Sequence, residues 1–257
     1  TLLVLAGIWF IATHDLSTLH LNWNTPIKSG GIITALFLGF SAAMLGISGF
    51  ESSANFVEEQ EVGVFPKTLR NMWGIVSFFN PALALIIIFV LPLSTVGEHQ
   101  TSLLAYLGEI TGGKWLAYFI SVDAVLVLCG AVLTSFVGVS GLVNRMTLDR
   151  ILPNFFLKQN KRGSHYRIAI AFLLLCVSIL FVTAGDLSSL AGVYTFSFLS
   201  VMALFGIGNL LLKAKRRKLP RPIKASILSV LIAVTFIIIA FYGNILLNED
   251  SFFTFLK

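Results

Sequence analysis

The sequence predicts an all-α protein, a bundle of helices that cross a membrane several times. Hydrophobic residues make up 56% of the 257 residues and charged residues only 12%, about half the charged fraction of an ordinary soluble domain. The apolar residues form long blocks, and a bilayer core about 30 Å thick needs about 20 of them per helix. Lys and Arg gather in every second connection between the blocks, as they do in multi-pass membrane proteins.

Three hydrophobic segments lie in the first part of the chain. Residues 1–13 are too few to span a bilayer, so the sequence predicts a helix that is cut at its start. Residues 31–56 form the second segment and are long enough to cross. Residues 72–93 form the third, and Asn80-Pro81 predicts a kink within it, because proline removes a helical hydrogen bond.

Four further segments follow, covering residues 115–143, 168–184, 190–212 and 223–247. The last residues, Phe252–Leu256, are apolar again and are a candidate start of another span. We therefore expect residues 1–257 to form a single transmembrane transporter domain. We expect this domain to be a fragment that lacks the N-terminal helices and the last helix of the transporter.

The basic residues orient these segments. Loops 57–71, 145–167 and 213–224 hold two, six and seven of them, 15 of the 18 in the chain. Cytoplasmic loops carry the excess of Lys and Arg, so we expect these three loops to be cytoplasmic in a plasma (inner) membrane. The run Lys213–Lys218 is interpreted as a topology anchor, with a patch for anionic lipids as the alternative.

Other functional classes receive little support. The net charge of +6 would suit nucleic acid, but its placement in alternate loops favours membrane topology. Cys129 and Cys176 both lie in apolar runs, which disfavours a disulfide framework or a metal site. The sequence lacks the phosphate-binding loops and nucleophile motifs of soluble enzymes. We expect no enzyme activity, no metal and no nucleic-acid partner; the oligomeric state is left open.

One non-cytoplasmic connection contains a short amphipathic segment. Residues 101–109 are predicted to form a helix that starts at Thr101 or Ser102 and ends at Gly112-Gly113. This helix is either part of a lid or packed against the ends of its neighbours, and the sequence does not separate the two.

The second span contains a polar stretch at membrane depth. Residues 46–55 read GISGFESSAN, and glycine lowers helix stability by about 1 kcal/mol relative to alanine. Unwound backbone survives in a membrane only against protein or a water-filled cavity, and such breaks bind polar solutes and ions in transporters. We therefore predict a break near Gly46–Gly49 that binds substrate. The candidate residues are Ile47, Ser48, Gly49, Phe50, Glu51 and Asn55.

Glu51 and Phe50 are the two strongest side-chain candidates in this stretch. A carboxyl group within a span is costly and commonly functional, so Glu51 is a candidate for contact with a substrate amine, a proton or a gate. Pairing with another helix, or a place at the cytoplasmic end, is the alternative. Phe50 is either a gate over the solute or ordinary packing.

Polar residues in the fourth segment (residues 115–143) and the sixth (residues 190–212) have two interpretations each. Asp123 is expected to be structural or to line a vestibule. Thr134 and Ser135 are candidate ligands for a coupling Na⁺, although Gly130, Thr134, Gly138 and Gly141 share a small face that suits helix packing. Tyr194 is an interface anchor or a gate.

Several motifs occur in order along essentially the whole chain. They are Gly49-Phe50-Glu51 with Glu58-Glu59 and residues 66–70 (PKTLR), residues 138–146 (GVSGLVNRM) with residues 149–153 (DRILP), and residues 191–194 (AGVY). Together they resemble the amino-acid permeases of the amino acid–polyamine–organocation (APC) superfamily. Gly141 departs from that family, in which many members carry a basic residue there.

The resemblance implies a LeuT-like fold of two inverted five-helix repeats, of which this chain would hold helices five to eleven. It also implies a substrate site between helices one and six, of which residues 46–55 would supply half. Helix one and the first part of helix five, where some relatives carry a lysine in place of sodium, would lie outside the chain.

The sequence thus predicts a secondary active transporter, a symporter or antiporter that moves amino acids or related amines by alternating access. The expected partners are a small-molecule substrate and the lipid bilayer, and the expected cofactors are none, with Na⁺ or H⁺ as the coupling ion. The alternatives are an inorganic-ion carrier of the cation–chloride type on the same fold, or a non-transporting permease-like sensor. A channel is disfavoured because the polar positions are isolated.

Overall fold

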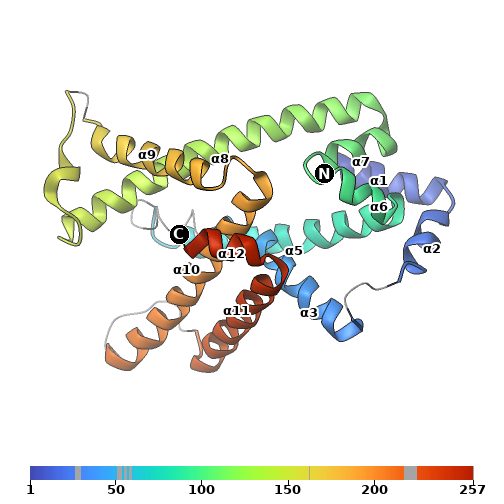
Figure 1. Ribbon diagram of the computed structural model, residues 1–257. Coiled ribbons are helices and arrows are strands. Elements are labelled where there is room, and N and C mark those ends of the chain that lie inside the picture. The colour runs from blue at the N-terminus through green and yellow to red at the C-terminus, as the bar shows by residue number, and fades with distance from the viewer. Residues whose placement is uncertain are drawn as a thin grey trace. The chain divides into compact units, whose positions relative to one another are not determined.

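The computed structural model describes residues 1–26, 30–50, 54, 57, 60–161, 163–216 and 225–256. Its described residues are mainly helical and contain no strand (Figure 1). Four helices are long and apolar enough to cross a membrane, which confirms the all-α, polytopic class. These are α5 (Val64–Val90), α8 (Lys114–Leu148), α10 (Leu187–Lys215) and α11 (Ile227–Leu247).

The other elements are shorter. Helices α1 and α2 are apolar enough to form a fifth span as a pair, although they bend by 97° at their junction. The shorter elements are α1 (Leu2–Thr13), α2 (Ser17–Trp23), α3 (Ile32–Ala43), the 3₁₀ turn η1 (Met44–Ile47), α6 (Leu93–Glu98), α7 (Leu103–Gly112), the 3₁₀ turn η3 (Asn154–Leu157), α9 (Tyr166–Val182) and α12 (Glu249–Leu256).

Each of the seven predicted segments contains a helix, but several boundaries differ. Helix α5 begins at Val64, so Lys67 and Arg70 lie in its first turns instead of in a loop. Proline at Pro66 does not prevent this start, because the first N–H groups of a helix have no helical partner. At Pro81 the helix continues as one element.

The chain divides into two compact units. The first combines Thr1–Pro26 with Gly49–Ile170, and the second combines Ile27–Ser48 with Ala171–Lys257. The chain thus passes from one unit to the other at Ser48–Gly49, within the predicted break. The single-domain organisation of residues 1–257 and the inverted repeat both stay predictions.

The core of the first unit lies between α1, α5, α7 and α8. Leu91, Leu107 and Leu116 are at most 1% exposed, and Leu3 and Ile86 pack with them. Helix α7 approaches α8 closely, because a Cβ atom on Gly108 would lie 2.5 Å from the Ile120 side chain. The predicted short helix is confirmed, with Ser102 before its first turn.

Helix α7 ends where Gly113 adopts a φ of +82°. This left-handed region favours glycine, so Gly113 lets the chain turn directly into α8. Figure 1 shows α7 beside the start of α8. The tight contact supports packing as the role of α7, while a lid function stays a prediction.

A single buried amide joins α2 to the end of α5. Asn22 donates hydrogen bonds to the carbonyl oxygens of Ile88 at 2.7 Å and Leu91 at 2.8 Å. Its Oδ1 accepts a third hydrogen bond from the N–H of Leu93 at 3.1 Å. The last carbonyls of a helix have no helical partner, so Asn22 satisfies α5 at its C-terminal end and holds α2 there.

The second unit is built around an aromatic cluster. Phe196 of α10 is fully buried, and its ring centroid lies 5.5 Å from that of Phe241, 5.3 Å from that of Phe252 and 5.9 Å from that of Phe255. Phe252 and Phe255 belong to α12, which also packs Ser251 against Gly192 of α10. The eight described residues of α12 thus cover the core of this unit.

Helix α10 has a side-chain cap at its start. Asp186 accepts a hydrogen bond from the Ser189 N–H at 2.7 Å, and hydrogen bonds from the Ser189 side chain and backbone hold the pKa of Asp186 below its ordinary value. The carboxylate also opposes the positive end of the helix dipole, so α10 begins at a defined residue.

Much apolar surface in the middle of α8 is not covered. Leu126 and Leu133 are each 66% exposed and Val132 is 70% exposed. Large exposed apolar surfaces are rare on soluble proteins, whereas lipid tails or further helices readily cover them. This exposure agrees with the membrane class that the composition predicts.

We predict that Asn22→Leu lowers the thermal stability of the full-length protein in detergent. The substitution leaves two carbonyls and one N–H group without the partner described above, at a cost of about 1–3 kcal/mol for each buried group. Asn24→Leu is the matched control, because Asn24 is exposed directly after the same short helix. Equal melting temperatures for the two variants would contradict the assigned role of Asn22.

Candidate functional site

The predicted break in the second span is confirmed. The α-helical pattern stops at Ala43, and Met44–Ile47 tighten into a 3₁₀ turn. Ser48 is extended, with φ −64° and ψ 161°, and its N–H donates to the Leu45 carbonyl at 3.2 Å. Gly49 has a φ of +111°, and Phe50 is helical again.

Gly49 is required by its backbone conformation. No atom lies within 4 Å of the place that a Cβ at Gly49 would take, so space is not the constraint. A φ of +111° lies in the region that L side chains rarely adopt, and glycine reaches it without steric cost. The sequence signal at Gly49 was therefore correct, and its physical cause is the positive φ that the backbone adopts there.

The structure describes part of the predicted site. Ile47 ends the 3₁₀ turn, and Ser48, Gly49 and Phe50 follow it directly, so these four residues lie together along the break. Glu51 and Asn55 lie outside the described residues. Contact of any of the six with a substrate stays a prediction.

An interruption of this kind can bind a polar solute. Between two helical segments the backbone N–H and C=O groups do not all follow the helical pattern, and they can point toward a bound molecule. Carbonyl oxygens suit an ammonium group, and N–H groups suit a carboxylate.

The span before the break is attached to α11 by a residue that the sequence did not single out. The Asn244 amide donates to the Ser41 carbonyl at 2.8 Å and to the Ala240 carbonyl at 2.9 Å. Asn244 is 3% exposed and Ser41 is fully buried. The available signal was an Asn inside an otherwise apolar run, which is rare in a span and is usually paired.

The proposed ion ligands lie on one exposed turn of α8. The Thr134 hydroxyl donates to the Gly130 and Ala131 carbonyls at 3.1 and 3.0 Å, and the Ser135 hydroxyl donates to the Ala131 carbonyl at 2.8 Å. Each hydroxyl oxygen keeps lone pairs that can coordinate a cation. Their role as Na⁺ ligands stays a prediction.

The packing alternative for this face of α8 receives partial support. Gly138 is buried. Gly130 and Gly141, by contrast, have open space where a Cβ would stand, so they do not make the close helix contact that their spacing suggested within the described residues.

Asp123 of α8 borders an apolar cavity of the first unit. The cavity has a volume of about 400 Å³ and lies between α1, α5, α7 and α8. Phe79, Leu83 and Phe119 are among its lining residues. A carboxylate at the rim of an apolar cavity agrees with the expected structural or vestibule position.

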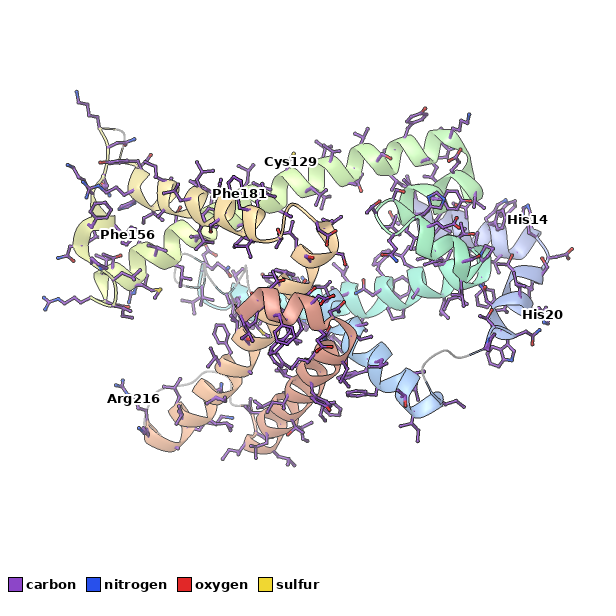
Figure 2. All side chains as sticks on the ribbon, viewed as in Figure 1. His14, His20, Cys129, Phe156, Phe181 and Arg216 are labelled. Atoms are coloured by element: carbon purple, nitrogen blue, oxygen red, sulfur yellow. The ribbon has the colours of Figure 1, made fainter. Side chains whose placement is uncertain are left out.

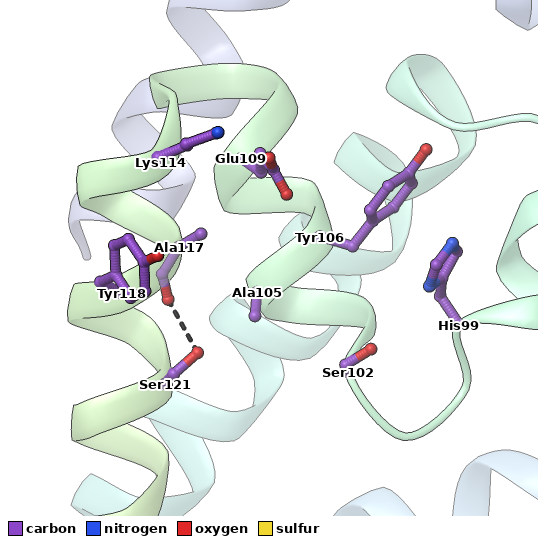
Figure 3. A pocket seen from close by; sticks show the side chains of 9 residues that line it. All are labelled: His99, Ser102, Ala105, Tyr106, Glu109, Lys114, Ala117, Tyr118 and Ser121. Carbon is purple, nitrogen blue, oxygen red and sulfur yellow. Dashed lines mark hydrogen bonds between the residues drawn. The ribbon is translucent and has the colours of Figure 1, made fainter.

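A more polar pocket lies in the connection between α5 and α8, with a volume of about 370 Å³ (Figure 3). The His99 and Tyr106 rings stack with centroids 4.1 Å apart, and Glu109 and Lys114 lie at the junction of α7 and α8. Most of the lining side chains are exposed. The pocket can admit a small polar solute but does not enclose one.

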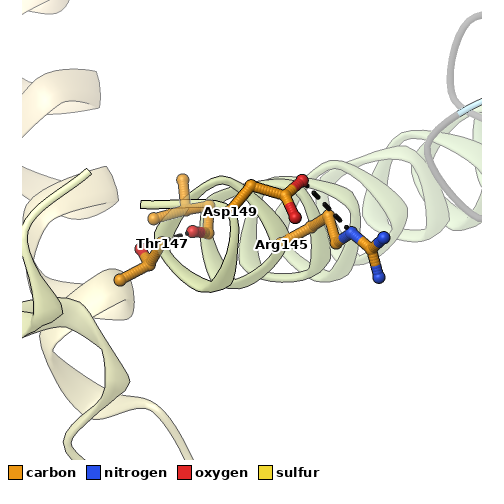
Figure 4. A network of polar contacts seen from close by, with 4 residues as sticks. Arg145, Thr147 and Asp149 are labelled. Carbon is orange, nitrogen blue, oxygen red and sulfur yellow. Dashed lines mark hydrogen bonds and ion pairs between the residues drawn. The ribbon is translucent and has the colours of Figure 1, made fainter. Parts of the chain in front are cut away.

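The opposite end of α8 carries a network of polar contacts (Figure 4). Arg145 Nε lies 3.3 Å from Asp149 Oδ2, and the buried Thr147 hydroxyl donates to the Val143 carbonyl at 2.7 Å. Farther on, the Arg167 guanidinium lies 4.0 Å from the centroid of the Phe155 ring and donates to the Phe155 carbonyl at 3.0 Å. Arg167 thus holds η3 beside the start of α9.

Histidine and cysteine side chains do not gather at any of these places. His14 and His20 lie on or beside α1 and α2, and Cys129 and Cys176 are free and exposed (Figure 2). In the described ranges no three His, Cys, Asp or Glu side chains form a group that could hold a metal ion.

Comparison with known proteins adds independent information. A model of the family described as amino acid permease matches residues 1–254. The chain is 24% identical over 227 residues to a protein named branched-chain amino acid permease BcaP, from Bacillus subtilis (strain 168). That match covers 86% of this chain and 47% of the relative, so the chain spans about half the length of the curated relative it matches. No solved structure matches the chain.

Proposed function

The chain belongs to the amino acid permease family, and on that premise we propose that it is the part of a secondary active transporter that supplies one side of an amino-acid site. The family and the four long apolar helices make it an integral, multi-pass membrane protein. The proposed mechanism is alternating access, in which the solute is exposed first to one side of the membrane and then to the other.

The break at Ile47–Phe50 is the single observation that carries this proposal. A segment in which an extended residue and a glycine of positive φ interrupt the helix is unfavourable in lipid, which supports a place against protein or a water-filled cavity. Backbone groups at such a break suit the ammonium and carboxylate of an amino acid. Glu51 and Phe50 are proposed to add a charged contact and an aromatic cover.

Branched-chain amino acids are the first substrates to test, because the similar Bacillus subtilis protein carries that name. Ile47 and Phe50 are apolar residues next to the extended backbone, and such neighbours favour an aliphatic side chain over a charged one. The coupling ion is proposed to be Na⁺ or H⁺, with the Thr134 and Ser135 oxygens as ligands in the sodium case.

We propose that loops 57–71, 145–167 and 213–224 are cytoplasmic and that the protein lies in the plasma (inner) membrane. Loop 57–71 now includes the first turns of α5. Helices commonly extend beyond the hydrocarbon core, so this start is compatible with the charge-based orientation.

Gly49→Leu is expected to abolish uptake of labelled leucine by the full-length protein in liposomes. A Leu cannot hold the φ of Gly49 without strain, so the chain would leave the break conformation. Gly39→Leu is the matched control, because Gly39 lies in the same span with helical backbone and open space around its Cβ position.

The result separates the proposed function from its alternatives. Normal uptake by Gly49→Leu would show that the break is not the site. Failure of the unaltered protein to transport or bind any amino acid would favour the inorganic-ion carrier, if ion flux is found, or the non-transporting sensor.

Single cysteines test the orientation in a full-length protein from which the native cysteines have been removed. Lys161→Cys should react with a membrane-impermeant maleimide only after the membrane is opened, whereas Lys114→Cys should react in intact cells. This pattern follows from the excess of basic residues on the cytoplasmic side. The reverse pattern would show that the predicted orientation is wrong.

A further inference from the structure

We propose that Asn244 is a positioning residue for the substrate site, because it holds the last α-helical turn before the break against α11. The inference deepens the proposed amino-acid transport and rests on it. It concerns contacts within the second unit only, and it assigns a function to a residue remote in sequence from the break.

Helices α3 and α11 pack closely against each other. The Phe37 and Tyr242 ring centroids lie 6.4 Å apart, and those of Phe40 and Phe236 lie 5.8 Å apart. Next to the Phe37–Tyr242 pair, a Cβ on Gly243 would collide with the Ser41 hydroxyl. Only glycine at position 243 therefore allows the Ser41 turn to come this close.

The hydrogen bond of Asn244 lies inside this contact. Both amide hydrogens are used, one on the Ala240 carbonyl of its own helix and one on the Ser41 carbonyl of α3. The donor side chain is 3% exposed, and a buried polar group that loses its partner is destabilising. The bond therefore favours one position of α3 along and around α11.

Ser41 lies immediately before the change in helix type. In an α-helix its carbonyl accepts from residue 45, but Leu45 lies in the 3₁₀ turn Met44–Ile47. Asn244 adds a hydrogen-bond donor at the place where the α-helix changes to the 3₁₀ turn. Ser48 follows one residue after the turn, so the place where α3 is held determines where the extended backbone begins.

The hydrogen bond between Asn244 and Ser41 joins two helices of the same compact unit. Ile27–Ser48 belong to the unit that contains α11, whereas Gly49–Ile170 belong to the other unit. Because α3 and α11 belong to one compact unit and are joined by this bond, we expect them to keep their relative position during transport. Without the Asn244 bond, α3 would shift on α11 and the break would be less well positioned.

Asn244→Asp is the sharpest test, because it keeps the shape of the side chain and removes the donor. In the full-length protein in liposomes we expect KM for leucine to rise about tenfold, the factor that corresponds to one ordinary buried hydrogen bond, with a smaller change in Vmax. Asn248→Leu is the control, because Asn248 is exposed at the end of the same helix and should leave both constants unchanged.

Amide hydrogen exchange provides a readout that does not depend on transport. Asn244→Asp should raise the exchange rates of residues 44–50 about tenfold while leaving those of residues 190–205 in α10, a helix of the same unit as Asn244, unchanged. A merely structural residue would change stability throughout its unit without selecting the break. Unchanged KM together with unchanged exchange in residues 44–50 would overturn the inference.

A second pair of variants keeps the test valid if Asn244→Asp fails to fold. Gly243→Ala should raise KM because the new methyl group displaces Ser41, and adding Ser41→Gly should restore it, because that change removes the obstructing side chain but keeps the carbonyl that Asn244 binds. No effect of Gly243→Ala, or no restoration by Ser41→Gly, would contradict the proposal. If the unaltered protein transports no amino acid, the proposed function fails, and the exchange measurement still decides the role of Asn244.

Discussion

The need to satisfy backbone polar groups away from water is the constraint on which the rest of this structure depends. A membrane interior offers no water to hydrogen-bond an exposed N–H or C=O group, so the chain is helical and its irregular places need partners from the protein. The end of α5 receives the Asn22 amide, and the turn before the break receives the Asn244 amide. Two asparagines thus support two of the places at which helical order stops.

The same constraint explains how the apolar residues are used. In the first unit Leu91, Leu107 and Leu116 are buried between helices, and in the second Phe196 is buried among other rings. These cores are small, because most apolar side chains of α8 and α11 face outward. Close helix contacts therefore contribute much of the packing, at Gly108 in one unit and at Gly243 in the other.

Features with a local cause could be predicted from the sequence. The seven hydrophobic segments follow from composition and length, the α7 boundaries from Ser102 and Gly113, and the break from Gly46, Ser48 and Gly49. Family membership was also accessible, since the motifs around Gly49 and residues 138–153 keep their order. The start of α5 was placed eight residues too late, because its first turns are polar and resemble a loop.

Features that depend on distant contacts could not be predicted. Nothing in the neighbourhood of Asn22 or Asn244 indicates that one would cap α5 and the other would bind the carbonyl of Ser41, 203 residues away in the sequence. For Glu51 and Asn55 the sequence remains the sole guide.

The length of α8 has a mechanical consequence. Its 35 residues extend about 52 Å at 1.5 Å per residue, whereas the hydrocarbon core is about 30 Å thick. A single uninterrupted rod therefore reaches from the polar pocket beside Lys114 to the Arg145–Asp149 pair at its other end. A tilt of this rod would move both of its ends, so a displacement at the Lys114 end would be accompanied by one at the Arg145–Asp149 end.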